Sequence, residues 1–275
     1  MASQFEAEQY ELAYPDGAEH HWWHVARSEI VFDVCERIGA TRGRVLDVGC
    51  GRGIVVRSLR GRGVDCSGVE LGPAKPLAGV EHFIRVNMNA LDLPLVEREQ
   101  TKTILLLDVI EHVPDPVVFL RALLAAFPNA IHVIVTVPAR PELWSNHDEF
   151  YGHHMRYTLP GIAKLADALQ ARSTWRRYFF RPLYPPLWLA ARLKLQRNVA
   201  LTAPSAWTRW IHRIVAKALV LEYRVLPSVL AGTSIIAAFS FEGVVRASGA
   251  PFRAGGALEA RTTPAGDRAG SLQAG

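Results

Sequence analysis

Short apolar runs alternate with amphipathic stretches along most of the chain, and this alternation predicts a sheet covered by helices. The run from Thr103 to Asp108 contains almost no polar side chain before its final acid. A strand this apolar is buried on both faces, which is typical of the middle of a parallel sheet. We therefore expect an α/β fold with a seven-stranded, mostly parallel sheet and helices on both faces. The expected strands are 45–48, 66–71, 82–87, 103–108, 131–137, 173–180 and 232–241.

Helical spacing of apolar residues fills several of the gaps between these runs. Crossover helices are expected at 51–62, 117–127 and 158–170, and an earlier helical pattern ends near Ile38. We expect residues 1–40 to form an N-terminal helical lid. The connection 139–158 shows no obvious element, and a connection this long inside a domain is usually functional or disordered. Its aromatic and histidine side chains favour a functional connection.

About 50 residues separate the last two expected strands, far more than a hairpin loop needs. We expect a helical insertion at about 182–231, with amphipathic helices at 186–195 and 206–223. Because the sixth strand runs parallel to the first five, the insertion leaves from the carboxyl edge of the sheet. Open α/β sheets bind their ligands at that edge. The insertion is therefore expected to cover a ligand pocket.

The amino-acid composition indicates where the domain ends and in which cellular compartment the protein is found. Hydrophobic residues make up 49% of the 275 residues, which is ample for a buried core. Residues 41–246 are expected to form one domain, whereas 247–275 contain too few large apolar side chains to repay ordering and are expected to be disordered. Three cysteines without ligand-like spacing indicate free thiols in a reducing compartment. The acidic N-terminus does not resemble a signal peptide, so we expect a cytoplasmic protein.

Basic residues are concentrated between Arg172 and Arg224, where Glu222 is the only acid. Aromatic residues are interspersed among these bases. Basic amphipathic helices are typical of contact with an anionic membrane surface, so the protein is expected in the cytoplasm with a possible membrane association. A helical cap with buried aromatic residues and solvated charges is the alternative. Nucleic acid is disfavoured, because the aromatic residues do not lie on a recognisable RNA-binding sheet.

The candidate chemistry begins where the first expected strand ends. Asp47 precedes three glycines at alternate positions, Gly49, Gly51 and Gly53. Glycine permits positive φ and has no Cβ, so a ligand can lie directly against the backbone. The helix start behind the turn offers N–H groups to a negative group, while Asp47 would repel a phosphate but bind an ammonium. The turn therefore suits an amino acid attached to a nucleoside.

The sequence from Val45 to Gly53 resembles motif I of the class I S-adenosylmethionine (SAM) methyltransferases, which implies a Rossmann-like fold and SAM as cofactor. Glu70 stands about 20 residues beyond the glycines, where such folds place the carboxylate that binds ribose hydroxyls. Asn89 and Ala90 occupy the adenine-binding positions. The family usually has an acid at the first of them, although an asparagine oxygen can also accept from the adenine amino group; Asp92 is a competing candidate. The implied cofactor-binding residues are Asp47, Gly49, Cys50, Gly51, Gly53, Glu70, Asn89, Ala90 and Asp108.

Two later segments, 108–116 and 143–158, resemble the ubiquinone-pathway O-methyltransferases and related bacterial small-molecule and glycan methyltransferases. The resemblance implies methyl transfer to a hydroxyl oxygen of a small-molecule, glycan or lipid-linked acceptor. One base that removes the hydroxyl proton is enough for this reaction. His112 and His153 follow carboxyl strand ends and are the catalytic candidates. A structural role in tying down a loop is the alternative for each histidine.

Two further functions remain open from the sequence. Asp108, Glu111 and His112 share one face if the fourth strand passes directly into a helix. Together with His153 they would offer carboxylate and imidazole ligands to Mg²⁺, Mn²⁺ or Zn²⁺, an arrangement similar to that of the small-RNA 2′-O-methyltransferases. The identity of the metal, if one binds, is unknown. A SAM-binding scaffold that docks on a membrane without catalysing transfer is the non-enzymatic alternative.

Overall fold

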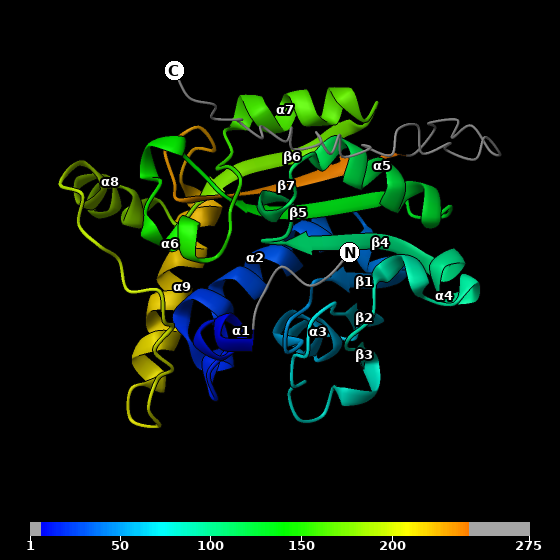
Figure 1. Cartoon of the computed structure of the whole chain (residues 1–275), viewed down its shortest axis with the longest axis horizontal. Helices are drawn as coiled ribbons and strands as arrows, with labels where there is room; N and C mark the ends of the chain where they lie inside the picture. The colour runs from blue at the N-terminus through cyan, green and yellow to red at the C-terminus, as the bar shows by residue number, and fades with distance from the viewer. Residues whose placement is uncertain (1–6, 242–275) are drawn as a thin grey trace, which may run out of the picture. The chain divides into compact units, whose positions relative to one another are not determined.

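The computed structural model describes residues 7–241 and contains a seven-stranded sheet in the order β3-β2-β1-β4-β5-β7-β6 (Figure 1). All neighbouring strands pair in parallel except β7, which is antiparallel to both β5 and β6. The expected α/β class and mostly parallel sheet are confirmed. The tail expected at 247–275 lies outside the described residues. The strands are β1 (Arg44–Val48), β2 (Cys66–Val69), β3 (Ile84–Arg85), β4 (Thr101–Leu107), β5 (His132–Pro138), β6 (Arg172–Phe179) and β7 (Ser234–Ser240).

Helices cover both faces of the sheet, and this explains the unbroken apolar runs. In β4, Leu105 and Leu107 belong to the core on the side of α2, α3 and α9, whereas Ile104 and Leu106 belong to the core on the side of α5 and α7 (Figure 1). Successive side chains of a strand point to opposite faces, so both sets must be apolar. The α-helices are α1 (Ala7–Ala13), α2 (Trp22–Arg37), α3 (Ile54–Arg60), α4 (Leu95–Gln100), α5 (Pro116–Ala126), α6 (Asn146–Phe150), α7 (Leu159–Ala168), α8 (Tyr184–Arg192) and α9 (Arg209–Val225).

Two expectations about local structure are corrected. The third strand is only two residues long, because a 3₁₀ turn at Glu81–Phe83 takes up the first part of the expected run. The connection 139–158 contains helix α6, which Ser145 and Asp148 begin with a reciprocal capping box. The inserted helices α8 and α9 do lie between β6 and β7.

Strained backbone marks the carboxyl edge of the sheet. Four residues other than glycine adopt positive φ within two positions of the end of a parallel strand: Asn87 after β3, Asp108 after β4, Arg140 after β5 and Phe180 after β6. Such conformations are uncommon outside glycine and cluster at functional sites. The strain therefore points to the same edge that the fold reserves for ligands.

Candidate functional site

The glycine turn after β1 requires glycine at its three positions. Gly49, Gly51 and Gly53 have φ values of 75°, 54° and 78°, in the left-handed region. A Cβ on Gly53 would lie 2.0 Å from Ile84 Cδ1, and a Cβ on Gly49 would lie 2.9 Å from Val109 Cγ2. Neighbouring side chains therefore leave no room for a Cβ at Gly49 or Gly53, and the backbone conformation of the turn also favours glycine. Cys50, between the first two glycines, is buried, and burial raises the pKa of its thiol well above the usual value.

Asp47 is a buried carboxylate at the end of β1. Its side chain is 2% exposed, and Oδ1 accepts no hydrogen bond from the described residues. Burial raises the pKa of Asp47 to about 7; Arg27 opposes this shift, whereas Glu70 and Asp108 add to it. A cation that approaches Oδ1 would favour the ionised carboxylate. The observed position therefore fits an ammonium ligand.

Glu70, the residue after β2, ties the glycine turn to its neighbouring strand. Its Oε2 accepts from the Gly51 N–H at 2.7 Å, and its Oε1 accepts from the Gly72 N–H at 3.0 Å. The hydroxyl of Tyr10, on α1, donates to the same Oε1 at 2.6 Å. These three bonds fix the carboxylate at the expected ribose position and leave it with further lone pairs.

The segment that contains α1 covers the glycine turn. A Cβ on Gly51 would lie 2.7 Å from the ring of Tyr14, and one on Gly72 would lie 2.2 Å from the Tyr10 hydroxyl. The Arg52 guanidinium donates to the Tyr14 carbonyl at 3.1 Å and to Asp16 at 2.9 Å. No role was predicted for these tyrosines from the sequence. Their spacing of four residues, which suits one helix face, was the available signal.

Arg27 places a positive charge near Asp47, where it opposes the rise in pKa that burial causes. Its guanidinium forms an ion pair with Asp108 and lies 4.2 Å from the ring centre of Trp23. The arginine side chain is almost fully buried. Asp108 was expected near the cofactor, but the arginine that pairs with it was missed. The two residues are far apart in sequence, so no local pattern reveals the contact.

At the end of β3, the expected adenine-binding residues form a short cap. Asn89 Oδ1 accepts from the Leu91 N–H at 3.0 Å and thereby begins the 3₁₀ helix Ala90–Asp92. Ala90 is buried and Asp92 is exposed. The asparagine oxygen already holds one hydrogen bond, and a carbonyl oxygen can accept a second.

Three possible metal ligands meet beyond β4. One ligand atom from each of Glu111, His112 and His153 lies within 4.8 Å of the others, and the two imidazole rings are 4.8 Å apart between centres. Asp108 is not in this group and pairs with Arg27 instead. Asp108 was expected to share a helix face with Glu111 and His112 if the strand passed directly into a helix, and that condition is not met. The chain turns at positive φ at Asp108 and then forms the 3₁₀ helix Ile110–His112.

His153 is oriented by a buried carboxylate that the sequence analysis did not identify. Its Nδ1 lies 2.9 Å from Asp148 Oδ1, and Arg156 donates to both oxygens of Asp148 at 2.7 and 3.0 Å. Burial alone would raise the pKa of Asp148, but the bonds from His153 and Arg156 hold it below the usual range. The ionised Asp148 favours the His153 tautomer that carries its proton on Nδ1, so Nε2 is available as a base or ligand.

The neighbours of His153 have strongly shifted acid–base properties. Burial, with the charge of His153, lowers the pKa of His112 to about 4. Glu111 is 1% exposed, and neither of its oxygens accepts a hydrogen bond within the described part of the chain. Burial and then Asp108 raise the pKa of Glu111 well above its usual value. Groups with strongly shifted pKa values cluster at functional sites in proteins, so these residues indicate a functional site at this edge of the sheet.

Comparison with known sequences identifies the family. The methyltransferase domain family matches residues 22–178, more than half of the chain. The chain is 33% identical over 129 residues to the ubiquinone biosynthesis O-methyltransferase of Pseudomonas savastanoi pv. phaseolicola, covering 41% of this chain and 55% of that protein. It is 34% identical over 96 residues to the enzyme of the same name from Acinetobacter baumannii, covering 32% and 40%. The chain spans about half the length of the curated relatives it matches.

Comparison with solved structures finds only distant similarity. The methyltransferase domain of bacterial CtHen1 aligns with a TM-score of 0.46 and 14% identity, covering 78% of this chain and 97% of that one. The phosphoethanolamine N-methyltransferase 2 of Haemonchus contortus, solved with SAM, aligns with a TM-score of 0.42 and 15% identity, covering 72% and 48%. The family assignment therefore rests on the sequence match, which spans the glycine turn and most of the sheet. On that match the chain belongs to the methyltransferase domain family, whose methyl donor is SAM.

Proposed function

We propose that this methyltransferase transfers the methyl group of SAM to a hydroxyl oxygen of a small-molecule, glycan or lipid-linked acceptor. The observation that carries the proposal is His153, which Asp148 holds with its Nε2 available at the carboxyl edge of the sheet. A hydroxyl acceptor needs a base for its proton, whereas the sulfonium methyl is already reactive. The curated relatives named as O-methyltransferases agree with this choice of acceptor atom.

The cofactor would lie across the ends of β1 and β2. In this proposal, Asp47 binds the ammonium of SAM, Glu70 binds the ribose hydroxyls, and Arg27 binds the carboxylate at the glycine turn. Asn89 and Ala90 would contact the adenine, and Asp108 would orient Arg27. The support is the buried unpaired oxygen of Asp47, the fixed carboxylate of Glu70, and the charge of Arg27, which is close enough to oppose the burial-raised pKa of Asp47.

His153 is a stronger candidate for the base than His112. A group with a pKa near 4, as at His112, is a weak proton acceptor at neutral pH, although it is uncharged there. His153 instead has a carboxylate behind it that orients its ring and directs Nε2 away from Asp148, where it can accept a proton. We therefore assign proton removal to His153 and its orientation to Asp148.

The experiment is a screen of hydroxylated acceptors for formation of S-adenosylhomocysteine. With an accepted substrate, His153→Ala should lower kcat at least about 100-fold, because general base catalysis contributes factors of this size. SAM affinity should stay within about threefold, since the base acts on the acceptor. Asp148→Asn should lower kcat and shift the pH profile. A variant of His112 that loses all activity while His153→Ala retains it would reassign the base.

A metal-dependent enzyme is the second candidate function, and the group of Glu111, His112 and His153 favours it. A buried acid with two unpaired oxygens is costly unless a cation or proton satisfies it. The bond from His153 Nδ1 to Asp148 is the arrangement seen behind metal-bound imidazoles.

Calorimetric titration of the chelator-treated protein with Mn²⁺, Zn²⁺ and Mg²⁺ tests this candidate independently of any acceptor. Stoichiometric binding that Glu111→Gln and His153→Ala each abolish would support it. Full methyl transfer in EDTA, with no heat of metal binding, would exclude it. A protein that binds SAM but consumes none with any acceptor would instead favour the non-catalytic scaffold.

A further inference from the structure

Helix α9 has two apolar faces, and only one of them is buried. Ala216, Leu219 and Tyr223 pack towards α2 and β6. A second stripe on the opposite side of the helix remains exposed. Trp207, just before the helix, is 88% exposed, Trp210 is 61% exposed and Ile214 is 57% exposed. We call this set the outer stripe; its members are Trp207, Trp210, Ile211, Ile214, Leu221 and Val225.

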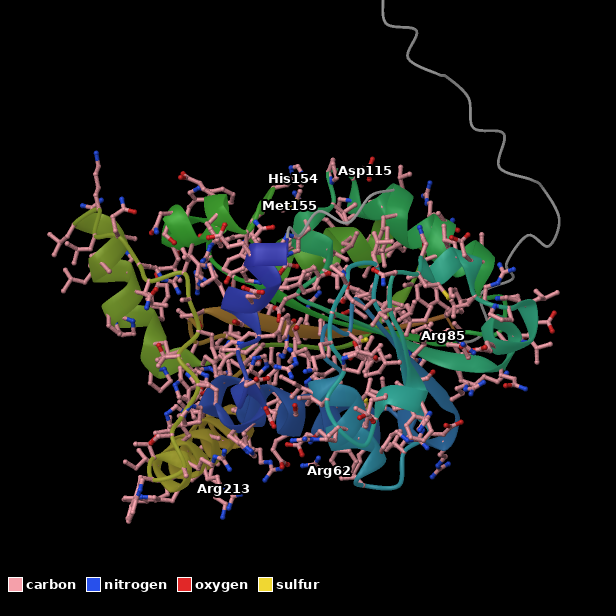
Figure 2. All side chains as sticks on the ribbon, turned by 60° about the horizontal axis from the view of Figure 1, so that its bottom comes forward. Arg62, Arg85, Asp115, His154, Met155 and Arg213 are labelled. Atoms are coloured by element: carbon pink, nitrogen blue, oxygen red, sulfur yellow. The ribbon has the colours of Figure 1, made fainter. Side chains whose placement is uncertain are left out.

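A row of bases borders the outer stripe. Arg209, Arg213 and Lys217 are spaced by four residues and therefore lie along one side of the helix. All three are exposed, and none forms an ion pair with any residue between 7 and 241. Figure 2 shows Arg213 on the outward side of α9. Helix α9 therefore presents unneutralised positive charge next to a strip of exposed apolar surface.

Helix α8 adds a smaller surface of the same kind. It has no buried residue, and Trp188 and Leu189 are exposed, as are Leu193 and Leu195 just after it. Arg192 and Lys194 lie among these side chains. In Figure 1, α8 and α9 both lie on the left, the side towards which β4 and β5 point. Other aromatic residues of the same basic segment, such as Phe179 and Phe180, are fully buried, so the exposed tryptophans are a distinct set.

We propose that the outer stripe of α9 docks on the surface of an anionic lipid bilayer, with the helix lying in the plane of the interface. The apolar stripe would enter the boundary between headgroups and acyl chains, where tryptophan is especially favourable. The bordering bases would reach the phosphates. Within residues 7–241 no helix is long and apolar enough to cross a bilayer. The proposal does not depend on which atom is methylated.

Charge and chemistry favour a bilayer over two other occupants. A second copy of the chain docked symmetrically through α9 would bring two rows of bases together, and like charges in an interface are unfavourable. Nucleic acid would neutralise the bases but would leave Ile214, Leu221 and Val225 against a charged backbone. An anionic bilayer satisfies the bases and the apolar stripe together.

The test is flotation of the full chain with phosphatidylcholine vesicles that contain or lack phosphatidylglycerol, at low and high salt. We expect binding to the anionic vesicles only, and weaker binding as salt rises. A triple variant, Arg209→Glu, Arg213→Glu and Lys217→Glu, should lower vesicle affinity at least about 100-fold, because each base contributes about fivefold and the three contributions multiply. Trp207→Ser with Trp210→Ser should also lower it at least about tenfold, with no change in the circular dichroism spectrum or in SAM affinity.

The matched control is Arg42→Glu with Lys102→Glu and Arg172→Glu, three exposed bases at the amino edge of the sheet. This variant should bind vesicles as the parent does. Equal failure of the parent protein to bind either kind of vesicle at low salt overturns the proposal. So does a control that loses as much affinity as the triple variant, since binding would then reflect net charge alone. A dimer in sedimentation velocity that Trp210→Ser dissociates, without vesicle binding, would assign the stripe to a second copy.

Discussion

Asp47 should make the affinity for SAM depend on pH near neutrality. Burial raises the pKa of Asp47 to about 7, so below that pH the free protein carries a protonated carboxyl there. An ammonium ligand prefers the ionised form, so binding at lower pH must release a proton. The dissociation constant should rise about tenfold per unit as pH falls below about 7.

Calorimetry from about pH 5.5 to about pH 7.5, in buffers that differ in ionisation enthalpy, measures this proton release. Asp47→Asn should bind SAM more weakly and without the pH dependence. A wild-type dissociation constant that stays constant over this range would remove Asp47 from the ammonium site.

Glu70 should contribute through hydrogen bonds that a neutral isostere only partly replaces. Hydrogen bonds to a charged group are worth about 1.5–3 kcal/mol each. Glu70→Ala should therefore weaken SAM binding by a few kcal/mol, and it also removes the acceptor of the Gly51 N–H. Glu70→Gln should lose less, because it retains one acceptor oxygen. Unchanged SAM affinity in both variants, measured by calorimetric titration, would show that ribose binds elsewhere.

The arrangement of residues could be predicted where a short stretch of sequence contains the whole pattern. Asp47 and the three glycines stand together in sequence, and the positive φ values occur at each predicted glycine. Arg27 was missed because its partner comes from another element, Asp108 lying 81 positions away. Asp148 was missed although His153 and Arg156 follow it by five and eight positions, because no regular element was expected in the connection 139–158. A charged residue shows nothing in sequence about which distant charge it will meet. Only the fold supplies that contact.

At the scale of elements, α1 should act as a cover that SAM must displace. Tyr10 donates to Glu70 and Tyr14 lies against Gly51, so both occupy the surface where the cofactor is expected. Tyr10→Phe removes one competitor for the carboxylate. We expect SAM affinity to rise about fivefold to tenfold, the value of one hydrogen bond of about 1 kcal/mol or slightly more.

Stopped-flow fluorescence would show the same effect as faster association. The control is Tyr184→Phe, which removes a surface hydroxyl bonded to Glu142 and should leave SAM binding unchanged. If Tyr10→Phe weakens SAM binding, the tyrosine is a contact of the bound cofactor and α1 closes over it.

Elements were predictable where burial dominates. β7 is buried along nearly all of its length, so its apolar run identifies it without help from alternation. Helix α6 was missed because five residues give too few periods to recognise, and its start depends on the Ser145–Asp148 capping box. β3 was overestimated because Phe83, in the 3₁₀ turn Glu81–Phe83, and Val86, just after the strand, resemble strand residues.

For the whole molecule, the insertion is fastened to the sheet by a buried ion pair. Arg181 Nη1 lies 2.5 Å from Glu222 Oε1 on α9, and both side chains are almost fully buried. Removing one partner of a buried pair leaves the other charge without compensation. Glu222→Gln should lower the free energy of unfolding by about 3 kcal/mol.

Urea denaturation followed by circular dichroism measures this loss. The more exposed pair of Arg224 and Asp33, which also joins α9 to α2, is the control: Arg224→Ala should cost about 1 kcal/mol or less. A loss of about 1 kcal/mol or less in Glu222→Gln as well would mean that the buried pair stabilises the fold no more than the exposed pair does.

The chain between α8 and α9 is hydrogen-bonded to both sides of the site. The Leu201 N–H donates to the Leu12 carbonyl on α1, and Tyr151 at the end of α6 donates to the Val199 carbonyl. A bilayer would hold α8 and α9, and a bound cofactor would move α1. Both would therefore act on the chain between α8 and α9. Thermodynamic reciprocity requires that lipid change the affinity for SAM by the same factor by which SAM changes the affinity for lipid. Binding of a new SAM molecule after each reaction would then depend on whether the enzyme is bound to lipid. Lipid binding would therefore control the rate of turnover.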